Sequence, residues 1–175
     1  FPYTTLFRSS ASVDTAHVTD FVRIAAIAAK AGFTDTTTAI DGLTTVLNSY
    51  GMSAENAGKI TDQMLMTQNL GKTTFGDLAQ GIGSVATAAS LAKVSTDDLF
   101  ASMAILTKNG VQTSEAFTGF QGILSAVSKQ SQQTVKTAAA LGLNFTPEHL
   151  GQVGWLKFLE EVKEKVGDDQ TAIQH

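Results

Sequence analysis

Apolar residues recur every three to four positions along almost the whole chain, the spacing of one face of an α-helix. Glycine or a short polar stretch interrupts this pattern, and Ser, Thr or Asp follows most interruptions. Those side chains accept hydrogen bonds from the free amides of a helix's first turn. No alternating pattern favours a strand. The pattern predicts an all-α fold, an array of about seven short helices in antiparallel hairpins with glycine-capped turns.

Glycines mark the predicted helix ends, and hydroxyl or carboxylate side chains mark the starts. The predicted helix-ending glycines are Gly32 (as a left-handed cap), Gly51, Gly71, Gly110 and Gly142. The predicted caps are Thr34 or Asp35, Ser53, Thr74 and Ser95. Asp77 follows Thr74 at the spacing of a capping box, and Asp98 lies in the first turn after Ser95, where a carboxylate faces the positive end of the helix dipole. These caps and turns, from Gly51 to Gly110, form a helix-cap and turn signature.

The lengths of the helices follow from where the apolar period breaks. The first is expected near residues 14–31, and residues 75–89 are predicted as one uninterrupted helix. A helix beginning near residue 113 is kinked or broken by the polar stretch 128–133. Thr146, before Pro147, starts a short turn, because proline suits the first helical position. An amphipathic helix over residues 155–166 ends the pattern.

A weak internal echo links two of the predicted helices. Leu47 and Gly51 recur 59 residues later as Leu106 and Gly110. A repeat array needs more than two copies to bury its apolar faces. We interpret the echo as two ordinary hairpins that share capping chemistry.

Composition narrows the classes of function. Only 16% of the 175 residues are charged, against about 25% in typical globular chains. The formal net charge is −4 and no basic patch stands out, so we predict no nucleic-acid binding. The absence of cysteine excludes disulfides and thiolate metal sites. The best apolar stretch, residues 24–29, is cut by Lys30, so no membrane-spanning helix is predicted.

The sequence matches to known catalytic, nucleotide-binding or metal-binding motifs are incomplete. Residues 81–86 fit the dinucleotide fingerprint G-x-G-x-x-A but lie inside a predicted helix, whereas the true motif follows a strand. His17, His149 and His175 have no second His or Cys at ligand spacing. We therefore predict no catalytic, cofactor-binding or metal site, and no enzyme.

Four short phrases carry a family resemblance. They are a glycine turn followed by Ser53 (residues 51–55), G-K-T-T-F within residues 71–78, V-S-T-D-D-L (94–99) and L-T-K-N-G (106–110). In this order and spacing they resemble the core region of phage tail tape measure proteins, over roughly residues 14–166. Residues 1–10 do not match, and we interpret them as a non-native or disordered leader. Residues 11–142 are then the core helical domain, and 143–175 a short turn and C-terminal amphipathic helix that continues into a missing remainder.

The resemblance implies a structural component of the virion tail, made in the host cytoplasm. Tape measure proteins lie inside the growing tail, their length sets the number of tail-tube rings, and they leave with the DNA at delivery. This implies self-association, contact with tail-tube or tail-assembly proteins, and host membrane contact at DNA delivery. If the chain self-associates, Phe117, Phe120 and Trp155 are candidate interface residues; the alternative is that they fill a private core.

Two other interpretations stay open. The small-residue helices 24–31 and 82–92 motivate a membrane-active or partner-binding helical module. The chain would otherwise be the non-catalytic part of a protein that carries a cell-wall hydrolase domain elsewhere.

Overall fold

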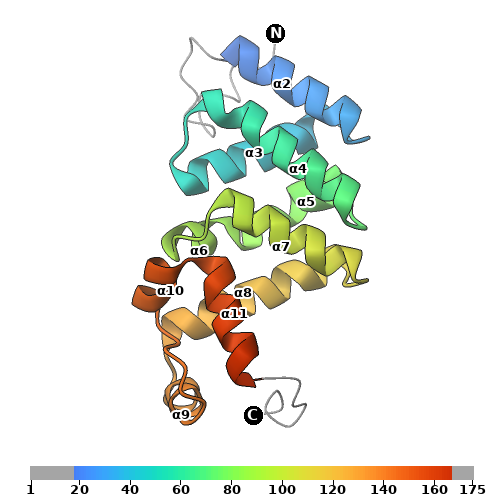
Figure 1. Ribbon diagram of the computed structural model, residues 1–175. Coiled ribbons are helices and arrows are strands. Elements are labelled where there is room, and N and C mark those ends of the chain that lie inside the picture. The colour runs from blue at the N-terminus through green and yellow to red at the C-terminus, as the bar shows by residue number, and fades with distance from the viewer. Residues whose placement is uncertain (1–17, 167–175) are drawn as a thin grey trace.

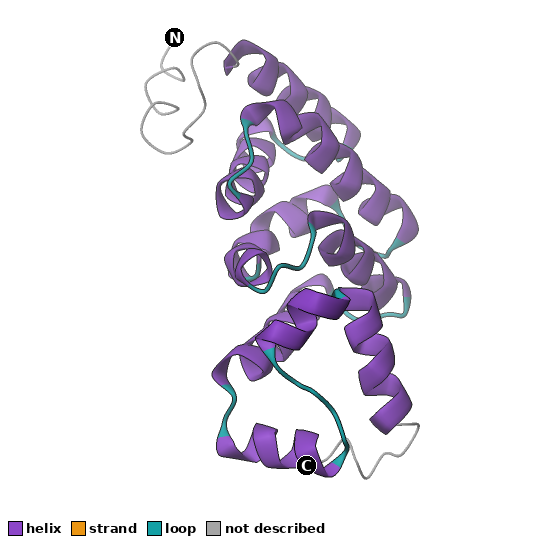
Figure 2. Cartoon of the chain, turned by 60° about the vertical axis from the view of Figure 1, so that its left-hand side comes forward, coloured by secondary structure: helices purple, strands orange, loops and turns teal. Residues whose placement is uncertain are grey.

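The computed structural model describes residues 18–166, and that part of the chain contains helices and turns only (Figures 1 and 2). The α-helices are α2 (Val18–Ala31), α3 (Thr36–Tyr50), α4 (Ala57–Leu70), α5 (Phe75–Gly81), α6 (Ala86–Leu91), α7 (Thr96–Lys108), α8 (Thr113–Lys129), α9 (Gln132–Ala140), α10 (Pro147–Val153) and α11 (Trp155–Val166). Two 3-10 turns are η1 (Ala54–Asn56) and η2 (Ile82–Ser84). The all-α prediction is confirmed, with ten α-helices in the described part instead of about seven. The predicted leader, residues 1–10, lies outside the described residues.

The helices form three successive pairs that recur at a nearly fixed spacing. The leading helices α2, α4 and α7 begin at residues 18, 57 and 96, each 39 residues after the one before. The returning helices α3, α5 and α8 begin at residues 36, 75 and 113, which are 39 and 38 residues apart. Leading helices contact one another in chain order, and so do returning helices, so the pairs stack side by side (Figure 1). The chain is therefore a repeat of helix pairs, and the interpretation that no repeat is present is wrong.

The 59-residue spacing does not match this repeat, because it relates the returning helix α3 to the leading helix α7. At the 39-residue spacing, three sets of residues hold equivalent places: Phe21, Ile60 and Leu99; Ala25, Met64 and Met103; Gly32, Gly71 and Gly110. The first two sets are buried throughout. Equivalent core positions hold residues as different in size as Ala25 and Met103. The three pairs therefore share their helix arrangement but few residue types.

The stretch predicted as one helix over residues 75–89 is broken in the structure. Helix α5 ends at Gly81, the 3-10 turn η2 follows, and α6 starts at Ala86. The Ser84 hydroxyl donates to the Gly81 carbonyl at 2.7 Å, a local bond that competes with the helical one. Phe117 of α8 takes the space beside Gly81, where a Cβ would lie 2.4 Å from the ring. The apolar face nevertheless runs across the break through Phe75, Leu78, Ile82, Val85 and Ala89, all buried.

The predicted left-handed cap at Gly32 is also wrong. The left-handed residue is Phe33, with φ of 52°, and its side chain is 93% exposed. The Thr34 amide donates to the Ala29 carbonyl at 2.9 Å and closes the end of α2. Glycine is required at position 32 for a different reason, because a Cβ there would lie 2.4 Å from the Cβ of Phe75.

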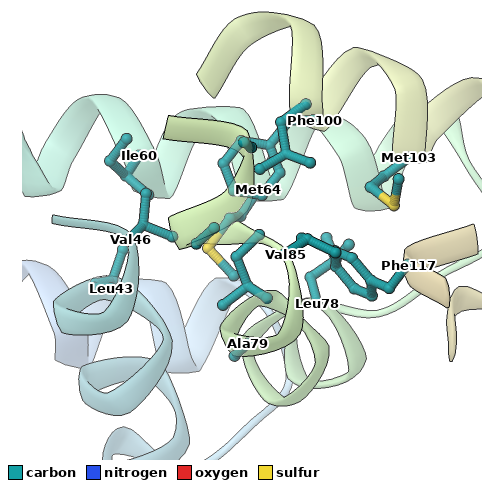
Figure 3. Packing of buried hydrophobic residues seen from close by; sticks show 14 of the residues in the cluster. Leu43, Val46, Ile60, Met64, Leu78, Ala79, Val85, Phe100, Met103 and Phe117 are labelled. Atoms are coloured by element: carbon teal, nitrogen blue, oxygen red, sulfur yellow. The ribbon is translucent and has the colours of Figure 1, made fainter. Parts of the chain in front are cut away.

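One continuous core joins the three pairs. Figure 3 shows side chains from leading and returning helices in one cluster, among them Leu43 of α3, Met64 of α4, Leu78 of α5 and Phe100 of α7. The polar residues buried with them, in the described part, are threonines: Thr61, Thr67, Thr96 and Thr107. The core therefore depends almost wholly on apolar burial, the dominant favourable term in folding.

The repeat stops after α8. That helix ends at Lys129, inside the polar stretch where a kink or break was predicted, and Gln130 takes the left-handed φ of 42°. Helix α9 then has no buried residue. Helices α10 and α11 return to the stack, where Leu150, Trp155 and Phe158 join the same core as the helix pairs. The bounds of α11 are the predicted 155–166.

Candidate functional site

Two of the signature caps share one geometry. The Thr74 hydroxyl accepts from the Asp77 amide at 3.0 Å and donates to the Asp77 carboxylate at 2.7 Å. Ser95 and Asp98 repeat this arrangement, at 3.1 Å and 2.8 Å. In the usual capping box a longer Glu or Gln reaches the backbone amide of the cap. Here the carboxylate of the shorter Asp binds the cap hydroxyl, so each pair locks the start of α5 or α7.

Ser53 does not cap an α-helix. Its hydroxyl makes no capping bond to the backbone, and its carbonyl accepts from the Asn56 amide at 3.0 Å, which forms η1. Asp35, one of the two alternatives for the preceding cap, accepts from the Thr38 amide at 2.8 Å and from its hydroxyl at 2.7 Å. The hydroxyl bond is the main reason why the pKa of Asp35 lies below its ordinary value.

The three signature glycines serve different purposes. Gly51 and Gly110 have left-handed φ values of 62° and 96°, which glycine adopts at little cost. Gly71 has an extended backbone, with φ of −97°. It is needed because Thr107 of α7 approaches so closely that a Cβ would lie 2.2 Å from the hydroxyl oxygen. The caps and turns of the signature thus position helices and hold no group for chemistry.

The three interface candidates lie in the chain's own core. Phe117, Phe120 and Trp155 are each 2% exposed. The rings of Phe120 and Trp155 are 4.6 Å apart between centroids, and the indole nitrogen donates to the Ser102 hydroxyl at 2.9 Å. These contacts hold α11 against α7 and α8. In this structure the three aromatic side chains are not presented to a partner, so self-association requires another surface.

Charged groups bridge elements on the surface. Lys59 and Gln63 of α4 donate to the Asp97 carboxylate of α7 at 3.0 Å and 2.6 Å. The bond from Lys59 is the largest cause, and that from Gln63 the second, that lowers the pKa of Asp97. His149 of α10 and Glu161 of α11 are 2.5 Å apart between Nε2 and Oε2, which fastens the last two helices together. These pairs join neighbouring helices.

Tyr50, the last residue of α3, carries a buried phenol with a shifted pKa. Its hydroxyl is buried and finds no hydrogen-bond partner in the described part of the chain. Burial, with a smaller contribution from the charge of Asp98, raises the pKa of the phenol. The phenol therefore keeps its proton to a higher pH than an exposed tyrosine does.

Among residues 18–166 the side chains that could bind a metal ion are scattered. No three His, Asp or Glu side chains in that range could hold a metal ion together. Residues 81–86, which fit the dinucleotide fingerprint, form helix and turn without a preceding strand over that range. Each helix among the described residues is too short or too polar to span a bilayer.

The surface does hold an apolar groove. It lies between α7, α8 and α11 and has a volume of about 310 Å³. Its lining includes Ile105, Leu106, Ile123, Trp155 and Leu156. Three of these, Ile105, Ile123 and Leu156, are also exposed to solvent. The groove is thus an exposed apolar feature formed where α11 packs on α7 and α8.

Comparison with known proteins points the same way. A family model described as phage-related minor tail protein matches residues 4–175. The probable tape measure protein of Clostridium phage phiCD119 is 37% identical over 83 residues, 47% of this chain and 9% of that protein. The tape measure protein of Pneumococcus phage Dp-1 is 27% identical over 111 residues, 63% of this chain and 10% of that protein. No solved structure shows a significant match.

The chain spans about a tenth of the length of these curated relatives. The resemblance to tape measure proteins is confirmed by their names and by the family model, and a structural role in a phage tail follows. Because that model covers nearly the whole chain, the chain belongs to the phage-related minor tail protein family, as a region similar to phage tail tape measure proteins.

Proposed function

We propose that this chain is a folded, non-catalytic module of a tape measure protein, which sets tail length during tail assembly and assists DNA delivery. The observation that carries the proposal is the match of the tail protein family over residues 4–175, together with two relatives named as tape measure proteins. The module would act in the virion tail after synthesis in the host cytoplasm. Its partners would be other copies of itself and tail-tube or tail-assembly proteins.

The fold decides how such a module would count toward tail length. A continuous helix advances about 1.5 Å per residue, so residues 18–166 as a single helix would span about 220 Å. The three helix pairs, with α10 and α11 counted as a fourth layer, form a stack. Stacked helices lie about 8–10 Å apart, so these four layers add only about 40 Å along the axis of the stack. A module that lies with its stacking direction along the tail is therefore a small, fixed increment of length, and the rest of the ruler comes from elsewhere.

The test is a tandem duplication of residues 18–166 in a phage that carries this chain in its tape measure protein. Electron microscopy of purified virions measures tail length, with the parent phage grown in parallel as the control. We expect tails longer by about 40 Å, because the second copy adds four more layers. An increase of about 220 Å would show that the segment acts as an extended rod. Tails of unchanged length would contradict a role of this module in setting length.

The absence of catalysis is tested separately. We expect no clearing when the purified chain is applied to a cell-wall overlay. Clearing by the folded chain that a heat-denatured sample does not give would contradict the non-catalytic proposal, and its loss in Glu161→Gln or Asp97→Asn would identify the carboxylate responsible.

A further inference from the structure

Helices α10 and α11 cover the end of the third helix pair, and we name them together the end cap (Figure 1). Gln63 of α4 faces the following pair and donates to the Asp97 carboxylate at 2.6 Å. Ser102 holds the equivalent position in α7, 39 residues later, and accepts from the Trp155 indole nitrogen at 2.9 Å. The end cap thus binds the third pair at a position where the second pair binds its successor.

Buried apolar side chains hold the end cap in place. Leu150 of α10, and Trp155 and Phe158 of α11, are each at most 2% exposed. The Trp155 ring packs on Phe120 of α8, with 4.6 Å between the ring centroids. A surface that fits a helix of its own chain fits the same helix of another copy equally well, which is the basis of domain swapping.

The connection between α8 and the end cap is loosely attached to the rest of the fold. Helix α9 lies in this connection and has no buried residue. Apolar burial is the main favourable term in folding, and α9 gains almost none of it from its present place. The helix can therefore change its course without a loss of core contacts.

The break between α8 and α9 is strained. Gln130 has φ of 42° and ψ of 54°, a left-handed conformation that is unfavourable for a residue with a Cβ. Residues 128–133 contain no Gly or Pro, and Lys and Gln are good helix formers. If Gln130 and Ser131 take helical dihedral angles, α8 and α9 become one helix over residues 113–140.

The apolar pattern also fits one unbroken helix. Leu124 and Val127 are buried in α8, and Val135 and Ala138 follow them after 11 residues. Eleven residues are close to three turns of an α-helix, so in one straight helix the four side chains would share a face. The break turns Val135 away from that face, and its side chain is 48% exposed.

We propose that two copies of this chain exchange their end caps. In each copy α8 and α9 straighten into one helix, and the end cap covers the third pair of the other copy. Trp155 then packs on Phe120 and Ser102 of the other copy, with the contacts that it makes in the closed chain described above. The inference rests on the self-association that the proposed function includes, and it gives that association a route.

The lengths of the segments fit a two-fold arrangement. The two straight helices lie side by side and antiparallel, and the axis passes between them at Gln130, perpendicular to both. Residue 140 lies ten residues after Gln130 and Phe120 lies ten residues before it. The end of α9 therefore comes beside Phe120 of the other copy, across the about 8–10 Å that separate packed helices. Residues 141–146 lead on to α10 and reach up to about 20 Å, which is enough to cross.

The exchange keeps the buried contacts of the end cap and changes the break. Relief of the left-handed Gln130 and new helical hydrogen bonds favour the exchanged dimer. The loss of the Ser131 cap, which accepts from the Thr134 amide at 3.1 Å, and the cost of association oppose it. The balance depends on concentration, and exchange is slow because each end cap must first leave its own core.

The first experiment measures mass by sedimentation, with circular dichroism on the same samples. The full chain is incubated over a range of concentrations in mild denaturant, which is then removed. We expect a dimer that persists on dilution. Gln130→Gly should reduce the dimer at least about tenfold, because glycine relaxes the left-handed residue in the closed chain and weakens the straight helix. Gln130→Ala keeps the strain and favours the helix, so it should retain the dimer.

Phe33→Gly is the matched control. It relaxes another left-handed residue, with φ of 52°, at the end of α2 and away from the end cap. The dimer should be unchanged in this variant. A monomer at every concentration for the parent and for Gln130→Ala, or equal losses in Gln130→Gly and Phe33→Gly, overturns the inference.

The second experiment identifies the exchanged element by contact quenching. One chain keeps Trp155, its only tryptophan, and the other carries Trp155→Phe and Ile105→Cys with a nitroxide label on that cysteine, the only one in the chain. Ile105 and Trp155 line the same groove, so exchange places the label of one chain beside the Trp155 of the other. We expect a loss of tryptophan fluorescence that develops during joint incubation.

A label at Met66→Cys is the control for this loss, because Met66 is 63% exposed on α4 and lies outside the groove. It should leave the fluorescence unchanged. A dimer that forms without quenching by the label at residue 105, or with equal quenching by the label at residue 66, overturns the exchange of end caps. The tail-length experiment does not depend on these outcomes, so failure here is distinct from failure of the proposed function.

Discussion

Gly71 at the end of α4 lies directly against Thr107 of α7. A Cβ at residue 71 would lie 2.2 Å from the Thr107 hydroxyl oxygen and 3.0 Å from the Thr67 carbonyl oxygen. Thr107 cannot turn away freely, because its hydroxyl donates to the Met103 carbonyl at 2.8 Å in a fully buried place. The contact sets how closely the second and third helix pairs approach.

The Gly71→Ala variant should therefore be less stable than the parent by about 1–3 kcal/mol, the usual cost of an added group in a packed core. Urea denaturation followed by circular dichroism measures the free energy of unfolding. Gly122→Ala is the control, because Gly122 is within α8 and a Cβ there meets nothing within 4 Å. It should gain about 0.5–1 kcal/mol from helix propensity. Equal effects of the two substitutions would contradict the close approach of α4 and α7.

Phe33 should be a site where a substitution stabilises the fold. Its φ of 52° strains a side chain that has 93% of its surface exposed. Phe33→Gly removes the strain, worth about 1–2 kcal/mol, and loses little burial. We expect a higher melting temperature by scanning calorimetry. Gly110→Ala, which places a side chain at φ of 96°, should lower it. A lower melting temperature for Phe33→Gly would show that the Phe33 side chain contributes contacts of its own.

The bridge from Asp97 to Lys59 and Gln63 should make stability fall in acid. Since the pKa of Asp97 in the folded chain is below its ordinary 3.8, the bridge stabilises at neutral pH and is lost as the pH falls through the folded value. The pair is exposed, so Asp97→Asn should cost at most about 1 kcal/mol at pH 7, and nothing below the pKa. Urea titrations at several pH values measure this, with Asp41→Asn as the control. A difference that persists unchanged in acid would contradict the bridge.

Trp155 should report how α11 is attached. Trp155→Ala removes a buried side chain and should cost about 3–5 kcal/mol. Ser102→Ala leaves the indole N–H without its 2.9 Å partner, and should cost about 1–3 kcal/mol. Because Trp155 is the only tryptophan, its fluorescence follows unfolding at this junction, while circular dichroism follows the whole chain. Fluorescence that changes well before the helical signal would show that α11 detaches separately.

The fold class and several helix starts could be predicted from sequence because their causes are local. Thr74, Ser95 and Thr146 each accept a hydrogen bond from an amide three residues on, and that spacing is visible in the sequence. The break after Gly81 could not be predicted, because it depends on the ring of Phe117, which is distant in sequence. The start at Ser53 failed for a related reason, since a 3-10 turn and a helix begin with the same residue types.

The same contrast between local causes and distant contacts applies to the candidate interface residues. Aromatic residues such as Phe120 look alike in sequence whether they fill a core or a partner's pocket, and only the packing of α11 decides between these. Ile27, Met66 and Ile105 recur at a spacing of 39 residues, which the sequence shows. Their exposure, which distinguishes them from core residues, depends on how the leading helices stack.

The stacking of helix pairs also has a mechanical consequence. In the described part, the main contacts of a pair are with itself and with the adjacent pairs. A force that pulls on one end therefore loads a single pair-to-pair interface at a time, and the other pairs stay folded until their turn. Each pair that opens releases about 39 residues, roughly 130 Å of extended chain. The protein should thus yield under tension as a series of small, similar ruptures.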